Sequence, residues 1–202
     1  MKPKAQQARP GRPRAFDADQ ALESAMRVFW RKGYQGASLS DLTEAMGINR
    51  PSLYAAFGNK EELFRKVLDR YGRGPASHMC DALEASTARE VARKILYGTV
   101  DLLRDPSHPP GCLGVNGILV GGKETEAVCQ EMAVRRCAAV EALKRRFARA
   151  KKEGDLPPTA DPAALALFVS TVTQGMSVHV ASGAGRSALR RVADLAMEAW
   201  PS

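Results

Sequence analysis

The sequence is poor in the residue types that build metal and catalytic sites. It has 4 cysteines, 3 histidines and 6% aromatic residues among 202. The cysteines form no Cys-x-x-Cys pair and have no histidine-rich spacing, which argues against a structural zinc site. No catalytic nucleophile, general base or phosphate-binding loop can be recognised in the sequence, so we expect neither an enzyme nor a bound cofactor. The residues concerned are Cys80, Cys112, Cys129, Cys137, His78, His108 and His179.

A secretory signal is also missing, because no apolar segment follows the basic N-terminal residues. We therefore expect a cytoplasmic protein with free thiols. Residues 162–185 contain no Asp, Glu, Lys or Arg and are long enough to cross a bilayer. They are rich in Ser, Thr, Gly and Gln, which favours a helix buried in a core or a subunit interface. Membrane association is the alternative, and it requires partition of the protein with lipid.

Positive charge is abundant and concentrated at one end. The formal net charge is +8, and residues 1–14 contain five basic residues and no acidic one. We interpret residues 1–15 as a basic flexible arm for a polyanionic partner. A tail that only increases solubility is the alternative.

Start and stop signals predict an all-α chain. In the first half, Asp17, Ser38, Asn49 and Asn59 are expected N-caps, and they open helices at about 18–32, 38–47, 49–57 and 59–71. Gly72, Gly74 and Pro75 mark a joint. The second half predicts helices at about 75–85, 88–104, 124–153, 161–182 and 187–200, with an apolar segment at 112–120 that is either helix or strand.

Residues 38–57 form a helix, a glycine turn at Gly47 and a second helix. A helix-turn-helix requires this order, because the second helix must reach into a major groove about 12 Å wide. The second helix is expected to bury Leu53 and Phe57 and to expose Arg50, Ser52, Tyr54 and Ala55. A basic arm before such a unit strengthens the prediction of a DNA-binding domain.

The stretch from Ala21 to Phe64 resembles the DNA-binding domain of the TetR family of transcriptional regulators. The matching motifs are Gly33–Tyr34, Gly47–Ile48, "SLY" at 52–54, Phe57 and "KEEL" at 60–63, whereas Thr43 replaces the alanine usual in the family. The resemblance implies an N-terminal three-helix helix-turn-helix DNA-binding domain at 16–72. It also implies a C-terminal helical ligand-binding and dimerisation domain at 75–202.

Roles for single residues follow from chemistry and from the resemblance. Arg50 can form paired hydrogen bonds with guanine, and Ser52 and Ala55 are short enough to approach base edges. Tyr54, Ser38 and Lys60 resemble family contacts to phosphate, although Tyr54 and Lys60 could be ordinary surface residues. Pro51 lies in the first turn of the same helix. Arg12 and Arg14 of the arm are expected in a narrow minor groove.

For the second half, the resemblance implies a homodimer through helices 161–182 and 187–200 around an effector cavity. Tyr97, Met176 and His179 are candidate cavity residues, with an ordinary core role as the alternative. Cys112 lies in "GCLGVN" at 111–116, which resembles a segment of a subset of TetR-type regulators in which a cysteine begins a short helix, and some relatives sense electrophiles or oxidants through a cysteine in this region. A helix N-terminus would favour its thiolate; a buried structural cysteine is the alternative.

These features predict a repressor that binds a palindromic operator as a dimer and is released by a small molecule or by an electrophile or oxidant. Two other classes stay open: an enzyme with a helical fold, and a DNA-binding protein without an effector. The basic end of the 124–153 helix is either a second DNA contact or a solvated helix end.

Overall fold

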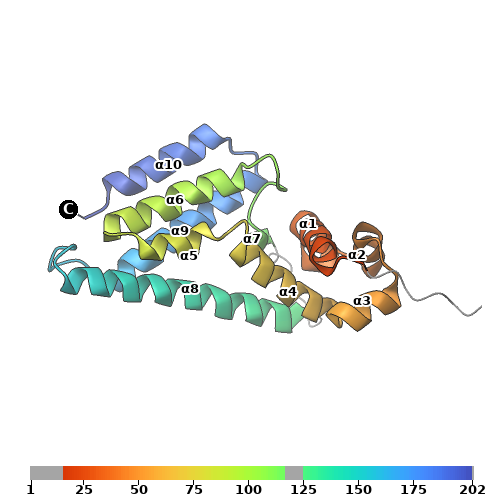
Figure 1. The fold of residues 1–202 in the computed structure, drawn as a ribbon. Coiled ribbons are helices and arrows are strands. Elements are labelled where there is room, and N and C mark those ends of the chain that lie inside the picture. The colour runs from red at the N-terminus through yellow and green to blue at the C-terminus, as the bar shows by residue number, and fades with distance from the viewer. Residues whose placement is uncertain (1–15, 117–124, 202) are drawn as a thin grey trace, which may run out of the picture.

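The computed structural model describes residues 16–116 and 125–201 (Figure 1). Within these ranges all regular secondary structure is helical, as the sequence predicts. The first four helices are α1 (Ala18–Gly36), α2 (Leu39–Met46), α3 (Arg50–Phe57) and α4 (Lys60–Arg73). They are followed by α5 (His78–Asp81), the 3-10 turn η1 (Ala82–Glu84), α6 (Ala88–Leu103), α7 (Leu113–Asn116), α8 (Glu126–Lys152), α9 (Pro162–Ala181) and α10 (Arg186–Glu198).

The helix break expected at Gly33 is present, with a φ of 68° and a ψ of 175°, and a short helical segment continues beyond it to Gly36. One expected helix was wrong. The single helix expected at 75–85 is replaced by α5 and η1. Arg12, Arg14 and the rest of the arm lie outside the described residues, as does the segment 117–120.

The N-caps that the sequence predicts are present and define the first four helices. Ser38 and Asn59 each form a reciprocal capping box, with Asp41 and Glu62 respectively. The Asn49 side chain accepts a hydrogen bond from the Ser52 amide at 2.9 Å. Because these hydrogen bonds are local, the sequence alone suffices to place the helix starts.

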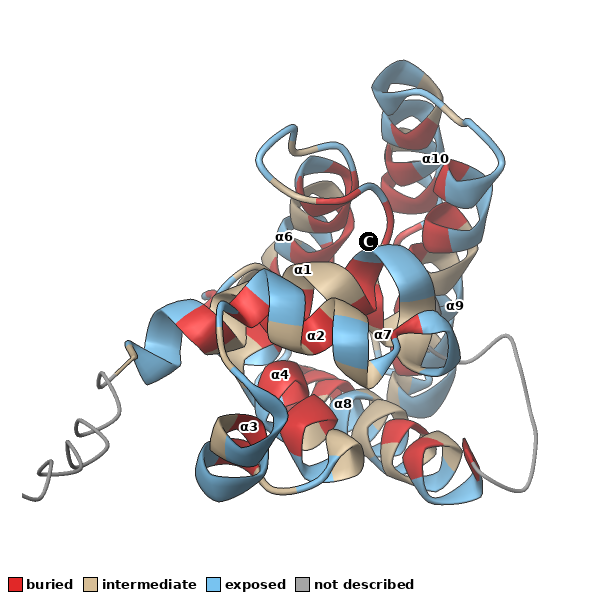
Figure 2. Cartoon of the chain, turned by 90° about the vertical axis from the view of Figure 1, so that its right-hand side faces the viewer, coloured by how far each residue is buried: buried red, intermediate tan, exposed pale blue. Residues whose placement is uncertain are grey.

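Two hydrophobic cores hold the helices together (Figure 2). The N-terminal core is formed mainly by α1–α4 and contains Phe29, Leu53 and Phe64. The C-terminal core is formed mainly by α6, α8, α9 and α10. Val128 and Met132 of α8 belong to the N-terminal core, so this helix runs from one core to the other (Figure 1).

Helix α9 is, in the described part of the chain, long and apolar enough to cross a membrane, with a mean hydropathy of 1.4. A third of its apolar window is buried inside this single chain. Its exposed apolar side chains are Leu167, Phe168 and Val178, and those of the adjacent α10 are Val192 and Leu195. These two helices therefore present apolar side chains that the described part of the chain leaves exposed.

Candidate nucleic-acid interface

Helix α3 lies at the edge of the molecule with its outer face open (Figures 1 and 2). Leu53 and Phe57 are buried in the N-terminal core, at 0% and 4% exposure. Arg50 and Ala55 are exposed, Ser52 is half-buried and Tyr54 is 49% exposed. The short α3 thus has one face that anchors it and another that is free to contact a ligand.

The turn between α2 and α3 depends on one glycine. Gly47 adopts the left-handed conformation, with φ 66° and ψ 28°, and it ends α2. The Ile48 amide donates to the Thr43 carbonyl at 3.1 Å, which closes the turn. The Cβ of any other residue would be strained at this φ, so the glycine sets the angle at which α3 leaves α2.

Arg50 has a partner that the sequence pattern did not reveal. One of its guanidinium nitrogens, Nη2, donates to the Ser40 hydroxyl on α2 at 3.1 Å. Both residues are exposed, so this hydrogen bond orients the arginine without removing it from solvent. Ser40 lies ten positions earlier and has no distinctive motif of its own, and only the turn brings it near.

Ser38 caps α2 with its oxygen and keeps its hydroxyl hydrogen available. Its Oγ accepts from the Asp41 amide at 3.0 Å, and its own amide donates to the Asp41 carboxylate at 3.0 Å. Hydrogen bonds from Lys32 and then from Ser38 lower the pKa of Asp41 to about 2. Because that pKa is depressed, the contribution of Asp41 to stability is complete above its usual pKa near 3.8 and is lost as the pH falls through 2.

Lys60 is not an ordinary exposed lysine. It is half-buried at the start of α4, and its Nζ lies 4.5 Å from the centre of the Tyr34 ring. Burial lowers the pKa of Lys60 and raises the pKa of Tyr34. The contact with the aromatic ring restricts the positions that the Lys60 ammonium can adopt, compared with a lysine free in solvent.

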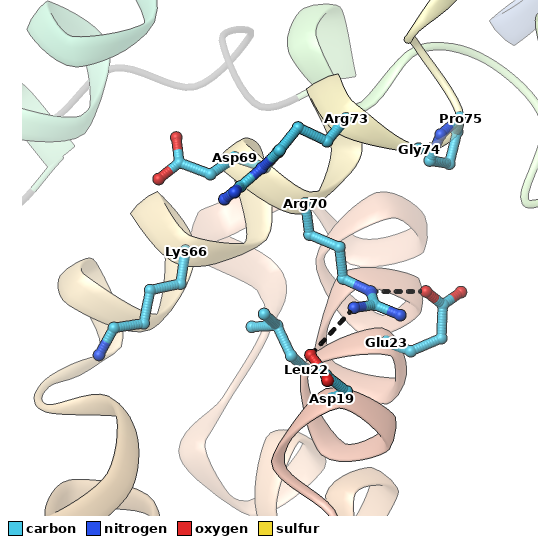
Figure 3. A pocket seen from close by; sticks show the side chains of 9 residues that line it. All are labelled: Asp19, Leu22, Glu23, Lys66, Asp69, Arg70, Arg73, Gly74 and Pro75. Carbon is cyan, nitrogen blue, oxygen red and sulfur yellow. Dashed lines mark hydrogen bonds and ion pairs between the residues drawn. The ribbon is translucent and has the colours of Figure 1, made fainter.

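A hollow of about 520 Å³ lies between parts of α1 and α4. Figure 3 shows the charged side chains that line it. Arg70 reaches across from α4, with Nε 3.0 Å from Glu23 and Nη1 3.4 Å from Asp19 (Figure 3). These ion pairs join the two helices within the hollow. We therefore interpret it as part of the support of α3 and not as a ligand site.

Two residues of the basic end of α8, Arg146 and Lys151, form contacts within the chain. Arg146 is buried and donates to the carbonyls of Leu83 at 3.1 Å and Ala85 at 2.7 Å. Lys151 donates to the Ala160 carbonyl at 2.7 Å. This end of α8 also lies far from α3 (Figure 1). These contacts favour a structural role over a second DNA contact.

The candidate cavity residues of the second half do not come together in one place. Tyr97 donates to Asp194 on α10 at 2.5 Å, and this hydrogen bond is the main cause of its raised pKa. Met176, which is buried, and His179, which is exposed, line an apolar groove of about 380 Å³ between α9 and α10. The groove belongs to the uncovered apolar surface of these two helices.

Cys112 lies directly before α7 and packs against both hydrophobic cores. The Tyr71 hydroxyl donates to its Sγ at 3.2 Å. Burial raises the pKa of Tyr71 well above its usual value, so the hydroxyl keeps its proton. The thiol is therefore connected directly to α4, the helix that supports α3.

Trp30 extends this connection to α1. Its indole Nε1 donates to the Gly111 carbonyl at 3.0 Å, and its ring packs edge-on against Tyr71 with centroids 4.9 Å apart. Sequence reasoning missed both aromatic residues as parts of a site. A signal was available, because a buried Tyr or Trp needs a partner for its polar atom.

Comparison with known proteins gives a consistent result. Residues 21–67 match the sequence profile described as "Bacterial regulatory proteins, tetR family". The chain is 34% identical to the HTH-type transcriptional repressor ComR of Escherichia coli (strain K12), covering 95% of this chain and 92% of ComR. It is 32% identical to the repressor BdcR of the same strain, over 98% of this chain and 96% of BdcR.

A solved structure shows the same likeness in three dimensions. A cysteine-substituted form of the TetR family transcriptional regulator CifR, complexed with 26-base-pair double-strand operator DNA, is 43% identical to this chain. The match covers 94% of this chain and 100% of the other, with a TM-score of 0.89. A TetR regulator from Rhodococcus sp. RHA1 is 39% identical over 92% of this chain, with a TM-score of 0.62.

Proposed function

Because this chain belongs to the TetR family and is a DNA-binding regulator, we propose that it represses transcription from a palindromic operator as a homodimer and is released by an effector. The observation that carries the proposal is α3, which is anchored by buried Leu53 and Phe57 and exposes Arg50, Tyr54 and Ala55. Its relatives are transcriptional regulators, so it is a regulator and not an enzyme. We place its action in the cytoplasm.

We assign three parts to the chain. Residues 1–15 are the basic arm, with Arg12 and Arg14 in the minor groove beside each half-site. Residues 16–72 read the major groove through Arg50, Pro51, Ser52 and Ala55, while Ser38, Tyr54 and Lys60 contact phosphates. Residues 75–202 bind the effector and the second copy. Selection of bound DNA from a random pool tests this assignment, and the absence of an inverted repeat would contradict it.

Arg50 is proposed to read one base pair in each half-site. Arg50→Ala is expected to reduce the preference for that pair by about 1–3 kcal/mol, because a bidentate contact to guanine is lost. Titrations against operators that vary at single positions measure this effect. Ser40→Ala is the control, since it removes the hydrogen bond that orients Arg50 but keeps the guanidinium. Uniform weakening on every sequence would make Arg50 a backbone contact instead.

The effector domain is proposed to pair through α9 and α10. A dimer matters physically because two recognition helices must enter successive major grooves about 34–36 Å apart. The apolar surface of these helices, including Leu167 at 60% and Leu195 at 64% exposure, supports this assignment. An effector that binds more tightly to a dimer with a different distance between its recognition helices will cause the dimer to dissociate from the operator.

Cys112 is proposed as a reactive thiol that senses electrophiles. An adduct on Sγ would remove the acceptor of the buried Tyr71 hydroxyl, and an unpaired buried hydroxyl costs about 1–3 kcal/mol. Cys112→Ser is therefore expected to bind operator normally but to keep it bound after treatment with N-ethylmaleimide. Operator release followed by fluorescence anisotropy provides the measurement.

Cys137→Ser is the matched control for this experiment, because Cys137 is exposed on α8. It should release operator as the parent chain does. If Cys112→Ser responds fully to N-ethylmaleimide, the role proposed for this thiol is wrong, and Tyr97, Met176 and His179 remain as candidates for a small-molecule site.

A further inference from the structure

The buried face of α8 is apolar towards both ends and carries an arginine between them. Val128 and Met132 belong to the N-terminal core, and Leu143 and Phe147 belong to the C-terminal core. Arg136 follows Met132 by four residues and precedes Leu143 by seven, and these helical spacings put all three on one face. The guanidinium therefore interrupts the apolar stripe at the boundary of the two cores.

One nitrogen of this guanidinium is buried without a partner. The Nη1 of Arg136 has no hydrogen bond, and the side chain forms no ion pair with any residue in 16–116 or 125–201. Arg146, on the same helix, satisfies its Nε and Nη2 with the carbonyls of Leu83, Ala85 and Ser86. A buried cationic donor without such partners is costly to the folded state.

Among the described residues, the helix that packs along α8, α9, contains no Asp or Glu. Helix α4 also contacts α8, and its Asp69 is paired with Arg135 at 2.8 Å. Glu131, five residues earlier on α8, is already paired, at 2.7 Å from Arg135 and 3.9 Å from Arg65. Within the described residues, neither α9 nor Asp69 and Glu131 supplies a counter-ion for Arg136.

We propose that Arg136 binds the carboxylate of an organic anion whose apolar body lies at the boundary of the two cores. A guanidinium accepts a carboxylate through two parallel hydrogen bonds, and Met132 and the half-buried Val140 flank it with apolar surface. Arg136 itself is half-buried, so an anion can reach it from solvent. This inference deepens the proposed effector response and rests on it.

Such a ligand has a physical route to the DNA-binding helices. Arg136 lies on α8, which enters both cores, and α8 also contacts α4 through Arg135, whose Nη1 is 2.8 Å from Asp69. An anion that binds one relative arrangement of the cores more tightly shifts the molecule towards it. Binding at Arg136 therefore biases the position of α4.

The test uses the full chain and a series of hexanoate, octanoate and decanoate, with methyl octanoate as the neutral counterpart and inorganic phosphate as a simple anion. Calorimetry gives Kd, and thermal unfolding gives Tm. We expect the carboxylates to bind and to raise Tm, and Arg136→Gln to weaken octanoate binding by about tenfold or more. Without ligand, Arg136→Gln should melt at or above the parental Tm, because it removes an unpaired charge.

Arg145→Gln is the matched control, since Arg145 is exposed on the same helix and its loss changes the net charge equally. It should leave octanoate binding unchanged. Arg136→Lys keeps the charge without the paired geometry and should fall between the parent and Arg136→Gln. This second variant also keeps the test valid if Arg136→Gln does not fold.

Three results would overturn the inference: no carboxylate binds, methyl octanoate or phosphate binds as tightly as octanoate, or Arg145→Gln weakens binding as much as Arg136→Gln. Operator release by N-ethylmaleimide in a chain that ignores carboxylates would overturn this inference alone. Failure to bind any DNA from the random pool would instead overturn the proposed function, whatever octanoate does to Tm.

Discussion

Phe29→Ala is expected to lower the free energy of unfolding by about 3–5 kcal/mol, the usual range for truncating a buried phenylalanine. Phe29 is fully buried at 0% exposure, and its ring meets Phe64 edge-on with centroids 4.9 Å apart. It also stacks on Tyr34 at 6.1 Å, which in turn lies beneath Lys60. The substitution removes the centre of the core that supports α3, so operator affinity should fall with stability.

Urea unfolding at one protomer concentration measures this effect, because the stability of a dimer depends on concentration. Arg31→Ala is the control, since Arg31 is exposed on the same helix, and such surface changes usually stay within about 0.5 kcal/mol. A loss below about 1 kcal/mol for Phe29→Ala would mean that the N-terminal core can collapse around the cavity, contrary to the packing described above.

Leu195→Glu is expected to convert the proposed dimer to a monomer and to weaken operator binding by about a hundredfold or more. Leu195 is 64% exposed on α10, so the change costs little within one chain. In the proposed dimer the new carboxylate would be buried without a partner, which typically costs several kcal/mol. Each 1.4 kcal/mol is a factor of ten in affinity.

Analytical ultracentrifugation and operator titration on the same samples measure the two effects together. Val134→Glu is the matched control, because Val134 is 55% exposed but lies on α8 and not on α9 or α10. It should remain dimeric and bind operator. A Leu195→Glu chain that stays dimeric would move the interface elsewhere, and equal effects of the two substitutions would indicate a general loss of stability.

The candidate effector residues illustrate what sequence reasoning could not reach. Met176 and His179 share a helix and therefore share a groove, whereas Tyr97 points to Asp194 on α10, 97 positions further along the chain. Whether such residues line one cavity depends on how α6, α9 and α10 pack. Spacing along a single helix contains no information about that packing.

The sequence predicted the caps and the buried residues of the DNA-binding half more fully. Ser38, Asn49 and Asn59 cap the helices that they were expected to cap, and Leu53 and Phe57 face inward. Each of these features depends on neighbours within about four residues, so the spacing of residues along the sequence is enough to predict it. The break expected at Gly33 is present, but the sequence did not reveal that the chain resumes a helix after it, up to Gly36.

The amino-acid order alone determined the helices, their caps, the glycine turn before α3 and the side of α3 that faces outward. Only the tertiary structure decided that Tyr71 donates to Cys112, 41 positions away, and that the Nη1 of Arg136 is buried without a hydrogen-bond partner among the described residues. The physical reason is the separation of the contacting residues along the sequence. Caps and helical faces form within one or two helical turns, whereas these contacts exist only after separate helices have packed.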